Sequence, residues 1–376
     1  MTHTSAGVRY PVQSRNIPSL DGMRALSILI VILAHSSWFL PVAIANSLSF
    51  QAVIGNGRNG VAVFFVISGY LITTLLCREY DKTGTISLKD FYLRRTLRIF
   101  PPYYFFLAVM AVLWWLQIIP EHPLSFLAAA TYTFALYPHP SGYFIAHSWS
   151  LSIEEIFYLF WPLAFLLGHR RGSAARIAWL LIVIMPILRL VIYFSVPDLR
   201  GHEGYMVHGW VDTMMIGCLL ALKRESSKWQ AFCSRYLNAW SAALLAIIGF
   251  WGITGLLLVL PKQYASFITL CFKPTILAVC IGGVLIYLIQ HPFSWVGRIL
   301  NHPIIRHIGV LSYSLYLWQQ LFVSNHLPCL PQGYLYALAA AEFSYWIVER
   351  PSLRFRSWLT RRLGSKKSQL SVAQSS

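Results

Sequence analysis

Long apolar runs, separated by short basic or turn-rich segments, dominate the chain. Such runs predict membrane-spanning helices, because about 20 apolar residues are needed to cross the hydrocarbon core of a bilayer. We expect ten spans, at residues 25–45, 60–77, 101–119, 149–168, 177–196, 206–222, 238–260, 268–289, 310–326 and 333–348. The expected fold class is all-α, a polytopic membrane protein of about ten transmembrane helices.

Composition and charge support this interpretation. The chain has 376 residues, of which 57% are hydrophobic and 11% charged, which excludes an ordinary soluble globule. Of the 30 Lys and Arg residues, 25 fall in alternate segments between the expected spans. That asymmetry follows the positive-inside rule, so it predicts that both termini are cytoplasmic. The net charge of +17 therefore reports orientation and gives no reason to expect nucleic acid.

One apolar segment, residues 124–137, is too short for a crossing. Treating it as a span would place Arg170, Arg171 and Arg176 outside, against the rest of the charge pattern. We expect a re-entrant or interfacial segment here.

The six cysteines show no metal-like spacing and predict neither a disulfide framework nor a zinc site. An alternative concerns the N-terminus, since Ala43-Ile44-Ala45 resembles a signal-peptidase site. Cleavage there would remove His35. The long basic lead and the long apolar run favour an uncleaved first span.

The stretch from Asp21 to His35 organises the candidate chemistry. On a regular helix Arg24 and His35 are ~16 Å apart along the axis and only ~20° apart around it. Arg24 is either a topology anchor or a ligand contact, and Asp21 either caps the helix or orients Arg24. His35, an ionisable group within a span, faces a cavity or substrate, or else hydrogen-bonds to a neighbouring helix.

Two later stretches carry further candidates. Ser68 is expected at a depth similar to that of His35, so the two can meet, although Ser68-Gly69-Tyr70 also suits close helix packing. Arg94, Arg95 and Arg98 precede the third span. Arg94 and Arg98 share a helix face, with Arg95 to the side. The three arginines serve either as topology signals or as a clamp for a phosphorylated ligand.

Three stretches of the chain together resemble the membrane acyltransferase-3 family. They are Arg24 and His35 with ten residues between them, then Ser68-Gly69-Tyr70, and then Phe91-Tyr92-Leu93-Arg94-Arg95 with Arg98. The resemblance implies an integral membrane O-acyltransferase that takes acyl groups from acyl-CoA on the cytoplasmic side and requires the first-span histidine. It places the donor with Arg24, Arg94, Arg95, Arg98, Ser68 and Tyr70.

His147 to Glu155 resembles the Trp-Ser-Leu-x-x-Glu-Glu segment of the same family. We expect His147, Glu154 and Glu155 toward the outer face, where an acceptor arrives, with both glutamates in the catalytic set and His147 in support. By itself, Ser152 with Glu155 also fits a capping box.

The match departs from the family in two places. Near Asp212, an arginine common in the family two positions earlier is Trp210 here, and we expect Arg189 to pair with Asp212 instead. After Trp318 many members have a histidine where this chain has Gln319, so no proton transfer is expected there.

The functional hypothesis is transfer of an acyl group, expected to be acetyl, from acyl-CoA through His35 to a hydroxyl of a cell-surface polysaccharide or other glycan. His35 acts as general base or as transient nucleophile. No metal is expected. The resemblance implies one membrane domain at 19–351 in the bacterial cytoplasmic membrane, between a cytoplasmic lead at 1–18 and a basic, partly disordered tail at 352–376. Alternatives are a small-molecule acceptor, such as an antibiotic, or a non-enzymatic glycan-lipid transporter.

Overall fold

The computed structural model describes residues 17–136, 142–200, 202–327 and 330–358. Throughout these residues the regular structure is helical, with no β-strand. The helices are α1 (Leu20–His35), α2 (Val42–Ala45), α3 (Leu48–Val53), α4 (Arg58–Thr83), α5 (Leu88–Trp115), α6 (Pro123–Ala130), α7 (Ser148–Arg170), α8 (Ala174–Ser195), α9 (Val211–Lys223), α10 (Ser227–Tyr236), α11 (Ala239–Ile247), α12 (Ile253–Val259), α13 (Lys262–Cys271), α14 (Lys273–Gln290), α15 (Trp295–Leu300), α16 (Pro303–Val323) and α17 (Gly333–Ser344).

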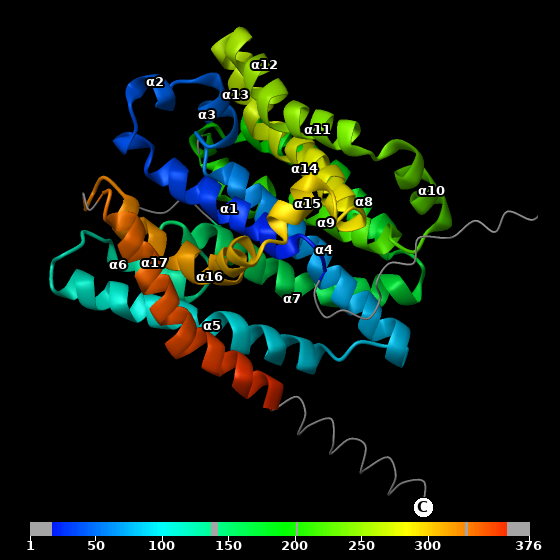
Figure 1. The fold of residues 1–376 in the computed structure, drawn as a ribbon, viewed down its shortest axis with the longest axis horizontal. Coiled ribbons are helices and arrows are strands. Elements are labelled where there is room, and N and C mark those ends of the chain that lie inside the picture. Colours follow the sequence, from blue (N-terminus) through cyan, green and yellow to red (C-terminus); the bar gives the residue numbers. More distant parts are fainter. Residues whose placement is uncertain (1–16, 137–141, 201, 328–329, 359–376) are drawn as a thin grey trace, which may run out of the picture.

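The helices pack around a central row. Along it α17 packs on α16, α16 on α1, α1 on α4, α4 on α9, and α9 on α8. On one side of the row α14 covers α9 and α4, and α11 covers α14. On the other side α7 packs on α4 and α5, and α5 also packs on α16. The first and second expected spans thus lie at the centre, as Figure 1 shows.

Glycines permit a close contact in this row between α4 and α9. A Cβ atom at Gly69 would lie 2.0 Å from the Met214 carbonyl oxygen, and one at Gly217 would lie 2.2 Å from that of Val66. Any larger residue would force the two helices apart, so these positions require glycine. The expectation of close helix packing at Gly69 is confirmed.

The first span is shorter than expected. α1 ends at His35, and the Ser36 hydroxyl donates to the Ile32 carbonyl oxygen at 3.0 Å. A 3-10 turn, Ser37–Phe39, and Pro41 follow, and proline has no amide hydrogen to continue a helical ladder. The expected span at 25–45 is therefore wrong in its second half. The composition of this run is apolar enough to predict a span, but its serines and proline end the helix. His35 lies at a helix end.

Six helical stretches are long and apolar enough to cross a membrane, among the described residues. They are Leu48–Thr83, Leu88–Trp115, Ser148–Arg170, Ala174–Ser195, Ala239–Val259 and Lys273–Gln290. The remaining expected spans coincide with shorter or less apolar helices, so the count of ten and the orientation of the termini stay predictions. α6 has only eight residues and cannot cross.

Candidate active site

Two cavities lie on opposite sides of a shared wall inside the central helices. The arginine cavity is narrow, about 80 Å³, and its polar lining comes from Arg24, Ser68, Arg95, Arg98, Ser150, Glu154, Tyr158, Ser312, Tyr313 and Tyr316. The histidine cavity is wider, about 910 Å³, and is lined on its polar side by His35, His147, Arg58, Lys273, Tyr143, Tyr205, Tyr316 and Gln320, among others. Val61 and Tyr316 line both, so these side chains form the wall between them.

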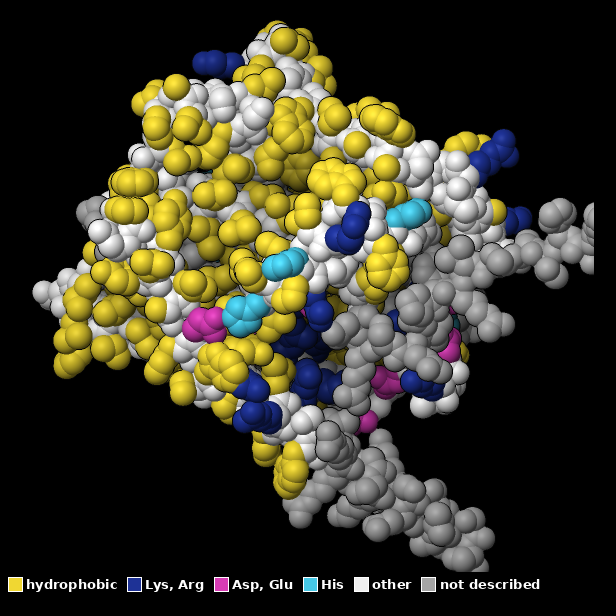
Figure 2. All heavy atoms as spheres, in the orientation of Figure 1, with side chains coloured by type: hydrophobic (Ala, Val, Ile, Leu, Met, Phe, Trp, Pro, Cys, Tyr) yellow, Lys and Arg dark blue, Asp and Glu magenta, His cyan; other side chains and the backbone are white. Residues whose placement is uncertain are grey.

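The arginine cavity gathers cations from two distant parts of the chain. Arg24 comes from α1, and Arg95 and Arg98 come from successive turns of α5. None of the three forms an ion pair within the described residues. Figure 2 shows Lys and Arg side chains gathered in a hollow near α15, α16 and α5, while apolar side chains cover much of the surrounding face. Three unpaired guanidinium groups around a narrow pocket suit a phosphorylated ligand.

Arg94 is separated from this group. Its guanidinium donates to Glu79 Oε2 at 2.8 Å, across the connection between α4 and α5. The sequence predicted that Arg94 and Arg98 share the binding face, with Arg95 to the side. The structure instead turns Arg95 and Arg98 into the cavity, because Glu79 at the end of α4 holds Arg94 away from it.

Glu154 and Ser68 also face the arginine cavity. The Ser68 hydroxyl donates to Glu154 Oε1 at 2.7 Å. Ser68 was expected to meet His35, but the two residues line different cavities. Glu154 was expected near the acceptor, yet it lines the arginine cavity together with Arg24, Arg95 and Arg98.

Two other sequence candidates line neither cavity. Glu155 of α7 is partly buried, and its Oε1 atom is buried without a hydrogen-bond partner among the described residues. Tyr70 is only 4% exposed, where α4 contacts α9. The placement of Glu155 differs from the expected acceptor face because successive helical residues point about 100° apart, so only Glu154 reaches a cavity.

His35 is held in one tautomer by its own helix. Its Nδ1 lies 2.9 Å from the Val31 carbonyl oxygen. Since a carbonyl oxygen only accepts, Nδ1 carries the hydrogen, and Nε2 of the neutral ring keeps its lone pair. His35 lines the histidine cavity, so the imidazole is in a form that accepts a proton or attacks a carbonyl carbon.

Asp21 lies in the first turn of α1, where a carboxylate favours the helix dipole. The N-cap residue is Ser19, which makes no side-chain cap, so the expected capping by Asp21 is not observed. The charge of Asp21 acts on Arg24, in keeping with the alternative orienting role. Because α1 is unbroken from Leu20 to His35, the ~16 Å offset between Arg24 and His35 holds.

His147 and Tyr316 join the two cavities. The Tyr316 hydroxyl lies 2.6 Å from Ser150 Oγ and 3.2 Å from the His147 carbonyl oxygen. The imidazole of His147 is 4% exposed, lines the histidine cavity, and has no hydrogen-bond partner on either nitrogen. Tyr316 was not among the site residues predicted from the sequence. It lies two positions before Trp318, and the resemblance to the family gave it no role.

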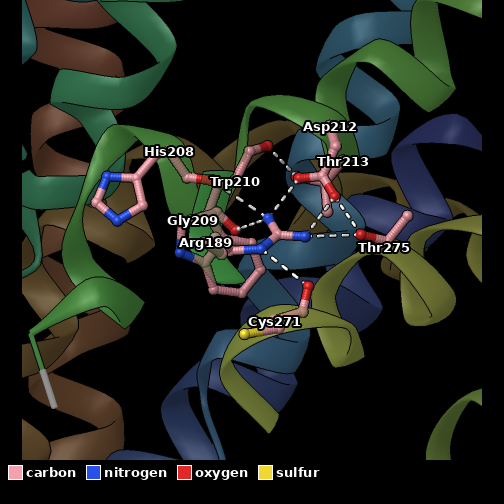
Figure 3. A network of polar contacts seen from close by, with 8 residues as sticks. All are labelled: Arg189, His208, Gly209, Trp210, Asp212, Thr213, Cys271 and Thr275. Carbon is pink, nitrogen blue, oxygen red and sulfur yellow. Dashed lines mark hydrogen bonds and ion pairs between the residues drawn. The ribbon is translucent and has the colours of Figure 1, made fainter. Parts of the chain in front are cut away.

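The expected ion pair between Arg189 and Asp212 is present, and it lies outside both cavities (Figure 3). Arg189 Nη1 and Nη2 donate to the two Asp212 oxygens at 2.9 Å and 2.8 Å. The remaining donors reach Thr275 Oγ1 and the carbonyl oxygens of Cys271, His208 and Gly209. This pair joins α8, α9 and α14 and has no capacity left for a ligand.

A comparison with known protein families gives one match over most of the chain. A family model described as an acyltransferase domain matches residues 17–346. No solved structure matches the chain.

Comparison with curated proteins gives relatives named as O-acetyltransferases. Peptidoglycan O-acetyltransferase OatA of Listeria monocytogenes is 30% identical over 84% of this chain and 50% of its own length. A putative O-acetyltransferase of Staphylococcus aureus is 29% identical over 93% of this chain and 59% of its own. Putative peptidoglycan O-acetyltransferase YrhL of Bacillus subtilis is 27% identical over 92% and 57%. The chain spans about half the length of these relatives. It belongs to the membrane acyltransferase-3 family.

Proposed function

We propose that this protein is a membrane O-acetyltransferase that moves an acetyl group from acetyl-CoA, bound at the arginine cavity, to a hydroxyl of a cell-surface glycan bound at the histidine cavity. The observation that carries the proposal is the pair of cavities on opposite sides of the wall formed by Val61 and Tyr316. The names of the relatives favour acetyl as the group and a glycan such as peptidoglycan as the acceptor. A phosphate-binding cavity and a tautomerically fixed imidazole have a clear use in such a transfer. A glycan-lipid transporter has no need of such an imidazole.

The donor end follows from charge. The phosphates of CoA are recognised by Arg24, Arg95 and Arg98, which have no protein anion within ion-pair distance. In the proposed orientation this cavity opens to the cytoplasm, where CoA is made. The narrow cavity admits the thin pantetheine arm, and the Arg24 to His35 offset of ~16 Å matches the distance that the arm has to cover.

The chemistry takes place at His35 Nε2, by one of two routes. As a general base, Nε2 takes the proton of the acceptor hydroxyl while that oxygen bonds to the thioester carbonyl carbon; the C–S bond breaks, and the thiolate takes the proton from the imidazolium. As a nucleophile, Nε2 attacks the thioester carbonyl carbon, the C–S bond breaks and the thiolate leaves; the acceptor oxygen then bonds to the acetyl carbon, the C–N bond to the ring breaks, and the hydroxyl proton passes to the thiolate. The hydrogen bond from Nδ1 to Val31 serves both routes, because it keeps the lone pair on the cavity side.

The test is a single substitution with a matched control. His35→Ala, purified and reconstituted in lipid, is expected to bind acetyl-CoA like the wild type and to transfer no labelled acetyl group to glycan, a loss of at least 10³-fold, on the order of the general acid–base contribution. His302→Ala is the control, because His302 is exposed, lies in neither cavity and makes no side-chain cap. Wild-type transfer by His35→Ala would overturn the proposal.

A further inference from the structure

The histidine cavity contains two cations for which transfer at His35 gives no role. Arg58 is the first residue of α4 and Lys273 the first of α14. Both side chains line the histidine cavity and also a small adjoining cavity beside Trp210. Both are partly buried, and they are close enough for their like charges to repel. Elements far apart in sequence thus place two repelling charges in one hollow.

No counter-charge for these two cations is found among the described residues. Arg58 donates from Nε to Asn56 Oδ1 at 3.2 Å, and its guanidinium lies 5.2 Å from the centre of the Tyr205 ring. Neither Arg58 nor Lys273 takes part in an ion pair of the described residues, and no described Asp or Glu lines the cavity. Partly buried cations without a counter-charge cost folding free energy, and an anionic ligand offsets that cost.

Other groups in the cavity also lack well-formed hydrogen bonds. Neither ring nitrogen of His147 nor Oε1 of Gln320 makes a hydrogen bond of good geometry with the described residues, although the two side chains interact with each other, and both line the cavity. Buried polar atoms are nearly always hydrogen-bonded in folded proteins. Unsatisfied atoms that face a cavity of about 910 Å³ therefore indicate a polar ligand there.

The two cations line the same cavity as the imidazole of His35. Gly57, the residue before Arg58, packs against the end of α1, and a Cβ atom built on it would lie 3.9 Å from His35 Cε1. A ligand anchored at Arg58 and Lys273 thus occupies the same cavity as the nitrogen that carries out the transfer.

We infer that Arg58 and Lys273 bind an anionic group of the acceptor, so that the acceptor is an anionic glycan. The anion is a carboxylate on a sugar or a phosphate on the carrier that holds the glycan, since both accept charge-assisted hydrogen bonds from these side chains. The inference deepens the proposed function. The claim that the bound anion belongs to the acyl acceptor rests on the proposed function, whereas the claim that an anion binds here rests on the unpaired cations.

The experiment measures equilibrium binding, separately from turnover. The full chain with His35→Ala is reconstituted in nanodiscs of neutral lipid. Two glycans of equal length are titrated: chitotetraose, which is neutral, and a tetrasaccharide of alternating N-acetylglucosamine and N-acetylmuramic acid with free carboxylates. Inorganic pyrophosphate is the competitor. We expect the charged glycan or pyrophosphate to bind at least tenfold tighter than chitotetraose, and the preference to weaken as salt rises.

Substitutions then assign the site. Arg58→Gln and Lys273→Met are each expected to weaken binding of the anion about tenfold and to leave binding of chitotetraose and of acetyl-CoA unchanged. Arg58→Lys keeps the charge and is expected to retain most of the affinity, which tests the site even where Arg58→Gln folds poorly. Lys262→Met is the matched control, because Lys262 is an exposed cation that lines none of the three cavities.

The outcomes separate the two anions and the two proposals. Strong binding of the carboxylated glycan assigns the site to a sugar carboxylate, and strong competition by pyrophosphate alone assigns it to a phosphorylated carrier. Equal binding of charged and neutral glycans without pyrophosphate binding, or an unchanged preference in both variants, would overturn the inference. Charge-dependent binding in a protein whose wild type transfers no acetyl group would remove the proposed function and leave the anion site standing.

Discussion

The ion pair of Arg189 with Asp212 and the cations of the two cavities are opposite uses of charge within one bundle. Arg189 is 1% exposed, and its guanidinium donates to Asp212, Thr275 and three carbonyl oxygens. Arg24, Arg95 and Arg98 surround one cavity, which Glu154 also lines, and Arg58 and Lys273 face another, whose described lining has no Asp or Glu. None of these five cations forms an ion pair with the described residues.

The difference teaches how a buried charge in a membrane protein is to be interpreted. A cation whose donors are all used by the protein fixes the positions of helices and can bind nothing else. A cation that faces a cavity without a counter-charge destabilises the empty protein and is available to a ligand. Substitutions at the first kind should lower stability, and substitutions at the second kind should lower binding without loss of stability.

The largest expected effect is at the paired site. Arg189→Met leaves Asp212 buried without its cation, which costs on the order of 3–5 kcal/mol of folding free energy for a buried pair broken on one side. We expect little folded protein after extraction, measured by size-exclusion chromatography and thermal unfolding in detergent. Arg200→Met is the control, because Arg200 is exposed and bonds only to the Tyr193 carbonyl and ring. Equal melting temperatures for the two variants would contradict the structural role.

A smaller effect is expected at the arginine cavity. Arg98→Gln removes a charge-assisted contact with the donor phosphates, each such contact being worth about 1.5–3 kcal/mol, so the KM for acetyl-CoA should rise roughly 10- to 100-fold. The melting temperature should not fall, since Arg98 forms no ion pair with the described residues. Arg94→Gln should change this KM less, because Arg94 is paired with Glu79 outside the cavity. A larger effect at Arg94 than at Arg98 would argue against the assigned donor site.

The smallest expected effect concerns the rim of the histidine cavity, where Glu121 accepts from the backbone amides of Phe144 and Ile145, next to the lining residue Tyr143. Burial outweighs these hydrogen bonds and raises the pKa of Glu121 from 4.5 to about 7. A raised pKa favours the protonated folded state, so this stabilisation is complete below pH 4.5 and is lost as the pH rises through about 7.

Glu121→Gln stays neutral at every pH and removes this dependence. Relative to the variant, the wild type should lose about 1 kcal/mol between pH 5 and 8, an amount reduced by solvent at a partly exposed side chain. Thermal unfolding of both proteins across that range is the measurement. A constant difference in melting temperature would show that Glu121 does not titrate there.

Some features follow from the sequence with little help from the fold. Apolar runs placed most of the long helices, because burial of apolar surface in lipid depends on composition over about 20 residues and hardly on neighbours. The short helix α6 was expected to be non-spanning for the same reason. The pairing of Arg189 with Asp212 was also predictable, since two opposite charges in adjacent apolar helices at similar depth have few other partners.

Other features depended on contacts between distant parts of the chain. Glu79 at the end of α4 decided which arginines face the arginine cavity. Local spacing in α5 carried no information about the position of Glu79. Ser36 and Pro41 ended α1 at His35 and brought the imidazole to the wall of a wide cavity. Arg58 and Lys273 were only two of 30 basic residues until the start of α4 and the start of α14 met in one cavity.

The sequence by itself determined the membrane-helical class and the family, and it predicted roles for Arg24 and His35, because those inferences depend on composition and on spacing along one helix. Only the tertiary structure divided the candidate residues between two cavities joined at Val61 and Tyr316. Which side chains share a cavity is set by packing among segments far apart in sequence, and helical periodicity alone does not contain that information.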